Sequence, residues 1–563
     1  MSRPRMIRTV VIGGGIAGLA TAALLAHEGH EVQLLERLDR VGGRAGTLER
    51  NGFRFDTGPS WYLMPGVFDH FFELLGTSTA EQLDLRTLSP AYRVFSEPNH
   101  DGGRPDPLTV PLGSEQVMRA FEQVEPGSAA RLAAYLASAR HTSDMAERFF
   151  LYNPFTKLQS LIQPEILRGL PDLARLLLTP LETFVSQRFQ HPVLRQVLGY
   201  PAVFLGTDPA NAPAMYHLMS ALDLGDGVQY PMGGFRQLVE RLEALAVDAG
   251  VRIQTGAEVL QITTREAALP GGKGHLGGLG RRRRLPGTAK REVTGVRWRE
   301  KHGSGDRQHF SVADVVVSGA DLHHTETTLL AAEDQSYPGT WWQRRTSGPG
   351  AVLVMLGVKG RLPELPHHSL FFTKDWQANF ASIFGDQPGI PDPASIYVCK
   401  PSATDPDVAP RDHENLFVLI PLPADPAIGS GGPDGTGDSL IEKTADAAID
   451  QIAEWANVPD LRGRIVVRQT IGPGDFSRDY NSWNGGMLGP AHTLRQSAMF
   501  RAQNASKRVR GLFYAGATTA PGVGVPMCLI SAELVLKRIR GDHSAGPSVI
   551  DSSPLKRTNS RLG

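Results

Sequence analysis

The first residues in the chain with a chemical signature are glycines near its N-terminus. Gly13, Gly15 and Gly18 fit the spacing G-x-G-x-x-G, between an apolar run over 9–12 and a helical pattern over 17–28. In such a turn the first glycine makes the bend, the second lets the backbone approach a pyrophosphate, and the third lets helix and strand pack closely. The helix N-terminus then offers free N–H groups to the phosphates.

An acidic residue follows at the distance that ribose recognition requires. The apolar run over 30–35 predicts the next strand, and Glu36 stands directly after it, 18 residues beyond Gly18. A carboxylate about 20 residues past the last glycine accepts hydrogen bonds from ribose hydroxyls. The spacing therefore predicts a strand-helix-strand unit that binds a dinucleotide. It argues against a secretory signal, which needs no glycines at fixed positions.

A second glycine pair and an arginine extend this pattern. RVGGRAGT at 40–47 contains Gly43 and Arg44, whose planar guanidinium suits phosphate oxygens. GFRFDTGPSW at 52–61 predicts a short strand that runs into a Gly-Pro turn. In this order the segments resemble the amine-oxidase-like flavoproteins, and within them the bacterial carotenoid desaturases of the phytoene desaturase type. PSWYLMP at 59–65 is similar to the actinobacterial members. The resemblance implies FAD as the cofactor.

The resemblance continues through most of the chain. YPMGGFRQLVERL at 230–242 is similar to the family segment in which a Gly-Gly turn opens a helix. VRIQTGAEVLQI at 251–262 is similar to the strand pair that supports the adenine, where the resemblance implies a backbone contact from Val259. DVVVSGAD at 314–321 is an apolar strand whose end, in relatives, leads the chain out of the FAD domain.

The last of these segments lies close to the C-terminus. RGLFYAGATTAPGVGVPMCLISAELVLKRI at 510–539 is similar to the family's flavin segment, with a strand over 512–515 and a helix from Cys528. The resemblance implies that backbone at Gly516, Gly522 and Gly524 lies against the isoalloxazine and ribityl of the flavin, and that Val525 also contacts the cofactor. Cys528 itself is interpreted as a small buried hydrophobe and not as a site of covalent flavin attachment.

These observations predict an α/β fold. We expect a Rossmann-like FAD-binding domain assembled from discontinuous segments, and a mixed α+β substrate domain with a helical lid region. The predicted segments are an N-terminal FAD-binding part over 1–95, a mostly helical substrate and membrane-contact region over 96–225, a middle FAD-binding part over 226–330 with a flexible insertion over 269–290, a substrate domain of sheet and helices over 331–495, a C-terminal FAD-binding part over 496–540, and a disordered tail over 541–563.

Composition excludes several classes of partner. Lysine plus arginine and aspartate plus glutamate both number 58, so the formal net charge is zero and no nucleic-acid partner is expected. The two cysteines provide neither a disulfide framework nor a metal site, and a reducing cytosol is the expected compartment. Because no uninterrupted apolar run reaches 18 residues, we expect peripheral attachment to the inner membrane face and no spanning helix.

Two stretches could contact that membrane. Leu, Phe and Arg crowd together over 145–190, which suits a lid that dips into lipid, although an ordinary amphipathic helix set facing the core has the same pattern. Trp341 and Trp342 stand beside two arginines, a combination favoured at a bilayer interface and equally compatible with an exposed loop.

The resemblance also supplies the expected reaction. It implies desaturation of phytoene, a long apolar polyene, toward neurosporene and lycopene, with a quinone or oxygen as electron acceptor. No catalytic residue is identified: His323, His324, Asp321 and Asp475 are interpreted as surface or capping residues. A desaturase or isomerase of a later carotenoid, an amine oxidase of the same fold and a non-catalytic prenyl-lipid carrier remain as alternatives.

Overall fold

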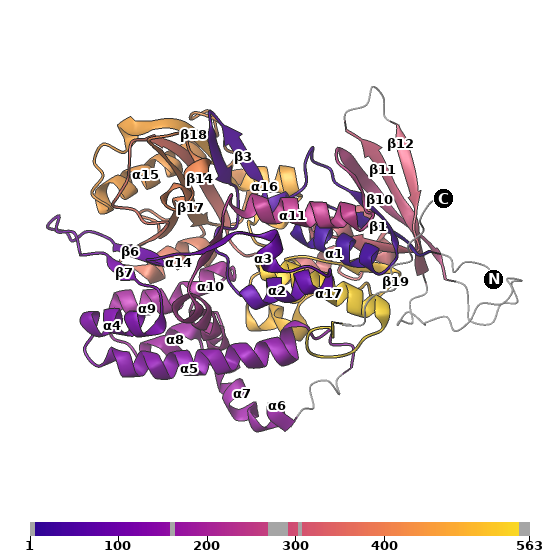
Figure 1. Ribbon diagram of the computed structural model, residues 1–563, viewed down its shortest axis with the longest axis horizontal. Coiled ribbons are helices and arrows are strands. Elements are labelled where there is room, and N and C mark those ends of the chain that lie inside the picture. Colours follow the sequence, from indigo (N-terminus) through magenta and orange to yellow (C-terminus); the bar gives the residue numbers. More distant parts are fainter. Residues whose placement is uncertain (1–5, 158–163, 268–290, 302–306, 551–563) are drawn as a thin grey trace, which may run out of the picture.

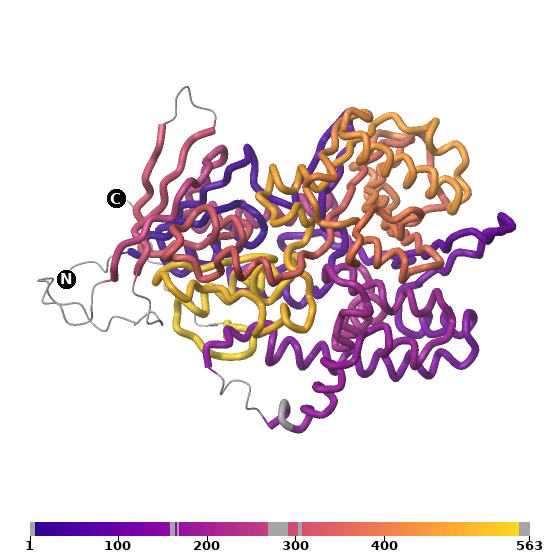
Figure 2. The backbone as a smooth tube through the Cα atoms, turned by 180° about the vertical axis from the view of Figure 1, so that it is seen from behind, coloured from indigo at the N-terminus to yellow at the C-terminus, as the bar shows by residue number. Residues whose placement is uncertain are grey.

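A computed structural model describes residues 6–157, 164–267, 291–301 and 307–550 of the chain (Figure 1). Two sheets dominate it. A parallel sheet and its helices form one side of the molecule, a large mixed sheet forms the other, and helices from 114–226 lie beneath the large sheet in this view. Viewed from behind, the N-terminal and C-terminal segments lie together in the parallel-sheet half (Figure 2).

The parallel sheet joins strands from four distant parts of the chain. Its order is β20-β13-β1-β2-β9, and every neighbouring pair is parallel. The strands are β1 (Arg8–Ile12), β2 (Glu31–Leu35), β9 (Arg252–Gln254), β13 (Val315–Ser318) and β20 (Leu512–Tyr514). Their carboxyl ends therefore meet at one edge of the sheet, which is where ligands bind in folds of this kind.

One helix anchors this half of the molecule. Helix α1 (Ile16–His27) is buried at every position from Ile16 to Ala26, as expected for a helix that is apolar all round. It packs against α11 (Phe235–Asp248) and α17 (Val525–Arg540) in a single core. The C-terminal helix thus begins at Val525, three residues before the predicted Cys528. Pro526 does not prevent this, because a proline in the first turn has no helical hydrogen bond to lose.

A smaller antiparallel sheet flanks the parallel one. It consists of β10 (Ala257–Glu266), β11 (Arg291–Glu300) and β12 (Gln308–Val312), and β19 (Val509–Arg510) joins β11. The predicted flexible insertion over 269–290 stands between β10 and β11 and lies outside the described residues.

The large sheet is buried on both faces. Its order is β18-β14-β17-β16-β15-β6-β7. Alternate residues of β14 face different cores, with Leu353 and Met355 on one side and Val352 and Val354 on the other. The strands are β6 (Tyr92–Ser96), β7 (Leu108–Val110), β14 (Gly350–Lys359), β15 (His368–Phe372), β16 (Ile396–Cys399), β17 (His413–Leu422) and β18 (Ile465–Ile471). The predicted segment boundary at 95/96 falls inside β6.

Helices cover both faces of the large sheet. Helix α15 (Ser439–Trp455) packs its apolar side on one face and occupies the residues over which it was predicted. The other face meets the helices of the stretch predicted as mostly helical. These are α4 (Ser114–Val124), α5 (Ser128–Ala146), η2 (Glu147–Leu151), α6 (Pro164–Arg168), α7 (Leu170–Leu178), α8 (Leu181–Ser186), α9 (Pro192–Gly199), α10 (Pro201–Phe204), η4 (Ala214–Leu218) and η5 (Ala221–Asp226).

Short elements complete the described part of the chain. The strand pairs are β3 (Thr47–Arg50) with β4 (Phe53–Asp56), and β5 (Leu85–Thr87) with β8 (Gln229–Pro231). Short helices used below are η1 (Gly43–Ala45), α2 (Pro65–Leu74), α12 (Leu322–His324), α13 (Gly339–Trp342), α14 (Trp376–Phe384), α16 (Pro473–Tyr480), η13 (Leu494–Gln496) and η14 (Ala498–Phe500).

Trp342 does not belong to a surface loop. It is 3% exposed in α13, and its indole N–H donates to the carbonyl of Tyr337 at 3.0 Å. The guanidinium of Arg345 lies 4.3 Å from the ring centre of Trp341. The interpretation of this pair as a bilayer anchor is therefore wrong for Trp342, which packs in the core beside the parallel sheet.

The predicted disordered tail is also wrong in its first part. The ammonium of the buried Lys537 donates to the carbonyls of Tyr152 at 2.9 Å, Ser544 at 2.8 Å and Gly546 at 2.7 Å. The amide of Ser548 donates to the carboxylate of Glu533 at 2.6 Å. Residues 541–550 therefore cover α17 through polar contacts, which their low apolar content did not reveal. Residues 551–563 lie outside the described part.

Deletion of 541–563 is expected to lower the thermal midpoint of unfolding. Lys537 loses two of its three carbonyl acceptors, and a lost hydrogen bond to a buried charge costs about 1–3 kcal/mol. Differential scanning calorimetry measures the change. Deletion of 551–563 alone is the matched control, since it keeps these contacts. Equal midpoints for the two truncations would show that the 541–550 contacts do not contribute.

Candidate functional site

A cavity of about 320 Å³ lies at the carboxyl edge of the parallel sheet. The segments that follow β1, β2, β13 and β20 all contribute to its wall. The predicted cofactor-binding residues found in this wall are Gly13, Gly15, Glu36, Gly43, Arg44, Val259, Gly516, Gly524 and Val525. Gly18 and Gly522 are the predicted residues that do not line the cavity.

The three glycines of the N-terminal turn differ in what surrounds them. Gly13 has a φ of +91°, which favours glycine, and a Cβ at Gly18 would lie 1.9 Å from the carbonyl oxygen of Gly13. A Cβ at Gly15 would meet nothing within 4 Å, although this residue lines the cavity and caps α1. The space in front of Gly15 and the free N–H groups of α1 fit a pyrophosphate.

Glu36 is fixed at the end of β2 by backbone amides. Its side chain accepts hydrogen bonds from the N–H groups of Gly14 at 2.6 Å and Leu38 at 2.7 Å. Burial raises the pKa of Glu36 above its usual range, against the opposing effect of these two bonds. Each carboxylate oxygen can accept a further hydrogen bond, and Glu36 lines the cavity. The residue therefore fits the expected ribose contact.

Arg44 provides a cation with unused hydrogen-bonding capacity. It lies in η1, its Nη2 donates to the hydroxyl of Ser482 at 3.0 Å, and Asp321 lies 3.8 Å away. Its Nε is buried and has no hydrogen-bond partner among the described residues. Arg44 also lines the cavity, so an anionic group there would pair with its guanidinium, and the residues present fit the phosphates of a dinucleotide.

The carboxylates of Asp321 and Asp475 cap the N-termini of two short helices. The carboxylate of Asp321 accepts from the amides of His323 and His324 in α12, and that of Asp475 accepts from Gly472 before α16. Both carboxylates are buried, in agreement with a capping role, and His324 also lines the cofactor cavity.

The loop between β20 and α17 is bound by the buried guanidinium of Arg501. Arg501 is 4% exposed and donates to the carbonyls of Thr519 at 3.0 Å and Ala517 at 2.6 Å. Gly516 and Gly524 have φ angles of +116° and +122°, where glycine is favoured. These contacts fix the loop between β20 and α17 at the cavity wall.

Cys528, in the first turn of α17, also lines the cofactor cavity. Burial raises the pKa of its thiol to about 11, so the thiol is protonated near neutral pH and is a weak nucleophile. The residue is half-buried, so its interpretation as a small buried hydrophobe without covalent flavin stays a prediction.

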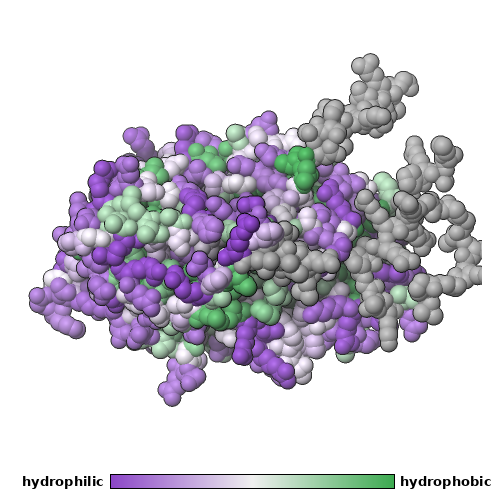
Figure 3. All heavy atoms as spheres, turned by 90° about the horizontal axis from the view of Figure 1, so that it is seen from below, coloured by the Kyte–Doolittle hydropathy of each residue, from purple (hydrophilic) through white to green (hydrophobic). Residues whose placement is uncertain are grey.

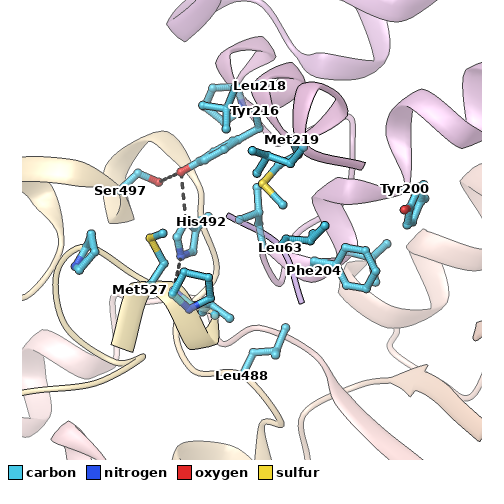
Figure 4. Close-up of a pocket in the computed structure, with 18 of the residues that line it drawn as sticks. Leu63, Tyr200, Phe204, Tyr216, Leu218, Met219, Leu488, His492, Ser497 and Met527 are labelled. Carbon is cyan, nitrogen blue, oxygen red and sulfur yellow. Dashed lines mark hydrogen bonds between the residues drawn. The ribbon is translucent and has the colours of Figure 1, made fainter. Parts of the chain in front are cut away.

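A second cavity of about 440 Å³, walled mainly by apolar side chains, adjoins the first. The two share part of their lining, namely Gly58, Pro59, Leu419, Met487, Leu488, Val523, Gly524 and Val525. Its remaining wall includes leucines, methionines and aromatic rings of the large sheet and the helical region, among them Phe204 and Met219, and Leu63 of the segment before α2 (Figure 4). A wall made mainly of apolar side chains fits a hydrocarbon ligand.

The wall of the large cavity also contains a fixed polar group. The hydroxyl of Tyr216 lies 3.0 Å from Nδ1 of His492 and donates to the hydroxyl of Ser497 at 2.9 Å (Figure 4). Nε2 of His492 accepts from the amide of Val523 at 3.2 Å. Burial lowers the pKa of His492 well below its usual range, so the ring is neutral. These residues come from segments that are far apart in the sequence, and no local pattern identified them.

Exposed apolar side chains surround one end of the large cavity. Leu170 and Leu178 on α7 are 51% and 75% exposed, and Phe500 on η14 is 59% exposed. The same two helices supply Leu173 and Met499 to the cavity wall. Figure 3 views the molecule from the side on which α7 lies and shows apolar surface among hydrophilic residues. Within the described ranges, no helix has the length and apolar content to cross a membrane.

The chain contains candidate metal ligands in one place among its described residues. A ring nitrogen each of His367 and His368 and the sulfur of Cys399 lie within 4.8 Å of one another, and all three residues are buried. The sequence predicted no metal site, and these residues lie in and beside the large sheet, behind the cavity wall.

The chain matches one protein family and is similar in sequence to carotenoid desaturases. A family model for flavin containing amine oxidoreductases matches residues 16–277. The chain is 38% identical to a carotenoid 3,4-desaturase of Haloarcula japonica, over 93% of this chain and 96% of that protein. It is 33% identical to a zeta-carotene-forming phytoene desaturase of Myxococcus xanthus, over 96% of each.

Solved structures show the same fold at low identity. An oxidoreductase from Methanosarcina mazei superposes with a TM-score of 0.56 at 16% identity, covering 94% of this chain and 100% of that one. Cyclohexylamine oxidase from Brevibacterium oxydans gives 0.53 at 14% identity, covering 95% and 99%.

Replacement by alanine is expected to have different effects at Gly15, which faces open space, and at Gly18, which lies against a backbone carbonyl. Gly15→Ala is expected to fold with an unchanged thermal midpoint and to purify with little FAD, because its methyl group enters the space of the pyrophosphate. Gly18→Ala is expected to lower the midpoint, because its Cβ would overlap a backbone carbonyl. Flavin absorbance of the purified proteins and calorimetry measure both effects. Full flavin content in Gly15→Ala would contradict the assignment of the cavity.

Proposed function

The chain belongs to the carotenoid desaturases among the flavin-containing amine oxidoreductases, and on that premise we propose that it desaturates phytoene in successive steps toward neurosporene and lycopene. It is an FAD-dependent oxidoreductase that acts on CH–CH groups, as its relatives indicate. The observation that carries the proposal is the wall shared by the cofactor cavity and the large apolar cavity.

The two cavities have different roles in this reaction: one would bind the cofactor and the other the substrate. Gly15, Glu36 and Arg44 would hold the pyrophosphate and ribose of FAD, and the loop from Gly516 to Val525 would contact its isoalloxazine. When bound, FAD supplies the acceptor for the hydride that leaves the substrate. The apolar side chains of the large cavity bind the hydrocarbon, orient it along the shared wall and exclude water.

A second candidate is 3,4-desaturation of a later carotenoid. It is favoured by the 38% identity with a protein of that name, which exceeds the identity with the phytoene desaturase of Myxococcus xanthus. Both substrates are long and apolar, so the cavity accommodates either class. Phytoene is the primary proposal because it is a hydrocarbon, the wall is mainly apolar, and the Tyr216 hydroxyl in it already has partners within the protein.

Substrate entry is proposed at the apolar end of the large cavity. Leu170 and Leu178 of α7 are exposed there, together with Arg168 and Arg175, whose charged tips suit lipid head groups. This face would rest on the cytoplasmic side of the membrane in which the substrate dissolves, and a quinone of that membrane or oxygen would reoxidise the cofactor.

The substrate prediction is tested by expression in a bacterium that accumulates phytoene. Pigments are extracted and separated by chromatography with absorbance spectra, and Gly15→Ala is the control with an impaired cofactor site. Coloured polyenes absent from the control are expected, and their spectra count the desaturation steps. Unchanged phytoene with a flavin-loaded wild-type protein would reject phytoene, and strains that accumulate later carotenoids would then test 3,4-desaturation.

The membrane prediction is tested with the double variant Leu170→Asp, Leu178→Asp. Burying one leucine side chain contributes about 1.5–3 kcal/mol, so the partition coefficient onto phosphatidylcholine vesicles is expected to fall about tenfold or more. Vesicle sedimentation measures it. Val247→Asp is the control, since Val247 is 52% exposed on α11 in the cofactor half of the molecule. Equal partitioning of both variants would show that α7 does not contribute to membrane binding.

A further inference from the structure

Three buried side chains take no part in the proposed reaction and lie together where β15 begins and β16 ends. They are His367, which directly precedes β15, His368, its first residue, and Cys399, the last residue of β16. A ring nitrogen of each histidine and the sulfur of Cys399 lie within 4.8 Å of one another. None of the three residues lines the cofactor cavity or the large cavity. Imidazole and thiolate are both ligands of transition metals.

Strand pairing brings these residues together from two segments of the chain. His368 and Cys399 are partners in the antiparallel pair of β15 and β16, so their side chains leave the same face of the sheet. The carbonyl of His367 accepts from the amide of Lys400 at 2.7 Å. The ring centres of His367 and His368 are 4.5 Å apart. The sheet therefore fixes the backbone of all three residues.

Each histidine has one ring nitrogen beside a hydroxyl and one without a partner. Nδ1 of His367 lies 2.8 Å from the hydroxyl of Thr404, and Nδ1 of His368 lies 2.8 Å from the hydroxyl of Tyr397. Both Nε2 atoms are buried and have no hydrogen-bond partner among the described residues. A buried polar atom without a partner is costly and points to a missing ligand. Histidines that bind a metal have their other nitrogen fixed by a hydrogen bond in this way.

The third side chain of the group is a free thiol. Cys399 is 1% exposed, and burial raises the pKa of its thiol to about 12. The thiol therefore keeps its proton near neutral pH until an ion with a high affinity for sulfur displaces it. Copper(I) and zinc are ions of this kind.

Ligand number and charge favour copper(I) over zinc. In the described part of the chain no further histidine, cysteine or carboxylate joins the group, whereas structural zinc takes four ligands. Two histidines and one cysteine in a trigonal arrangement are a copper set. Burial and the nearby ammonium of Lys400 lower the pKa of His367, so added positive charge is unfavourable there. Zinc in place of one thiol proton would add a positive charge, and copper(I) would not.

We propose that His367, His368 and Cys399 form a copper(I) site that joins β15 to β16. When the ion binds, the S–H bond of Cys399 breaks and its proton leaves to solvent. One Cu–S bond and two Cu–N bonds form, and the copper stays monovalent throughout. The site lies outside both cavities, so it does not depend on the proposed substrate.

The group needs only a small contraction to bind one ion. Bonds from a metal to imidazole and thiolate are about 2.0–2.3 Å long, so three ligands around one ion lie about 3.5–4 Å apart. Side-chain rotation must therefore bring the three atoms closer by about 1 Å. The hydroxyls of Thr404 and Tyr397 orient the two rings for this.

The test uses the full-length, flavin-loaded protein from cells grown with added copper. After passage over a chelating resin, plasma mass spectrometry is expected to find one copper per wild-type chain. Cys399→Ala removes the sulfur and is expected to lower the copper content about tenfold or more. Cys528→Ala is the matched control, because it removes the other thiol of the chain and leaves the proposed site intact.

A second variant and a spectroscopic measurement separate binding from folding. His367→Gln keeps the sulfur and is expected to lower the copper content in the same way. Copper-edge X-ray absorption of wild type is expected to show one sulfur at about 2.3 Å and two nitrogens at about 2.0 Å. Copper is expected to raise the thermal midpoint of wild type by about 2 °C or more and to leave that of Cys399→Ala unchanged. The flavin content and the copper-free midpoint of each variant show that it folds.

Four results would overturn the assignment. The first is wild-type protein that holds no copper after growth with added copper. The second is copper retained in Cys399→Ala, and the third is an equal loss in Cys399→Ala and Cys528→Ala. The fourth is zinc in place of copper in the wild-type protein.

Discussion

The architecture depends on the close approach of α1 to the strands beside it. Gly18 lies against the carbonyl of Gly13, and a Cβ on Gly319, at the end of β13, would lie 3.2 Å from the Cα of Gly18. Three backbones therefore meet with no side chain between them. This contact points the N-terminus of α1 into the cofactor cavity and lets α11 and α17 pack on its outer faces. A side chain at Gly18 would disturb the fold and the cofactor site together.

The reaction imposes a second constraint, because a flavin and a hydrocarbon need different surroundings. The cofactor cavity offers amides, a carboxylate and a guanidinium, whereas the large cavity offers chiefly apolar side chains. The two sheets supply these surroundings separately, and they meet along a wall that includes Leu419, Met487 and Val523. The Tyr216 hydroxyl and the His492 ring in the large cavity have partners within the protein, and the mainly apolar wall leaves positioning as the main contribution to catalysis.

Sequence patterns predicted the parts of this molecule whose chemistry is local. The predicted cofactor residues follow the carboxyl ends of strands, so the βαβ spacing brought them together, and α15 was recognised because its apolar period is continuous over 439–455. The polar residues of the large cavity could not be predicted because Tyr216 and His492, which lie 276 residues apart in the sequence, meet only in the fold. The 541–550 segment was misjudged because its contacts are polar, and Trp342 because its neighbours come from distant strands.

The strand order of the parallel sheet also affects how the protein is made. β20 joins β13 beside β1, and β20 and α17 are synthesised long after β1. At about 5–20 residues per second, roughly 25–100 s separate the emergence of β1 from that of β20. Throughout that interval the glycine turn is present, but the loop that would contact the isoalloxazine is not. The complete cofactor site can therefore form only after β20 and α17 have emerged, and a cell short of flavin would accumulate chains that contain both segments but are open at this edge.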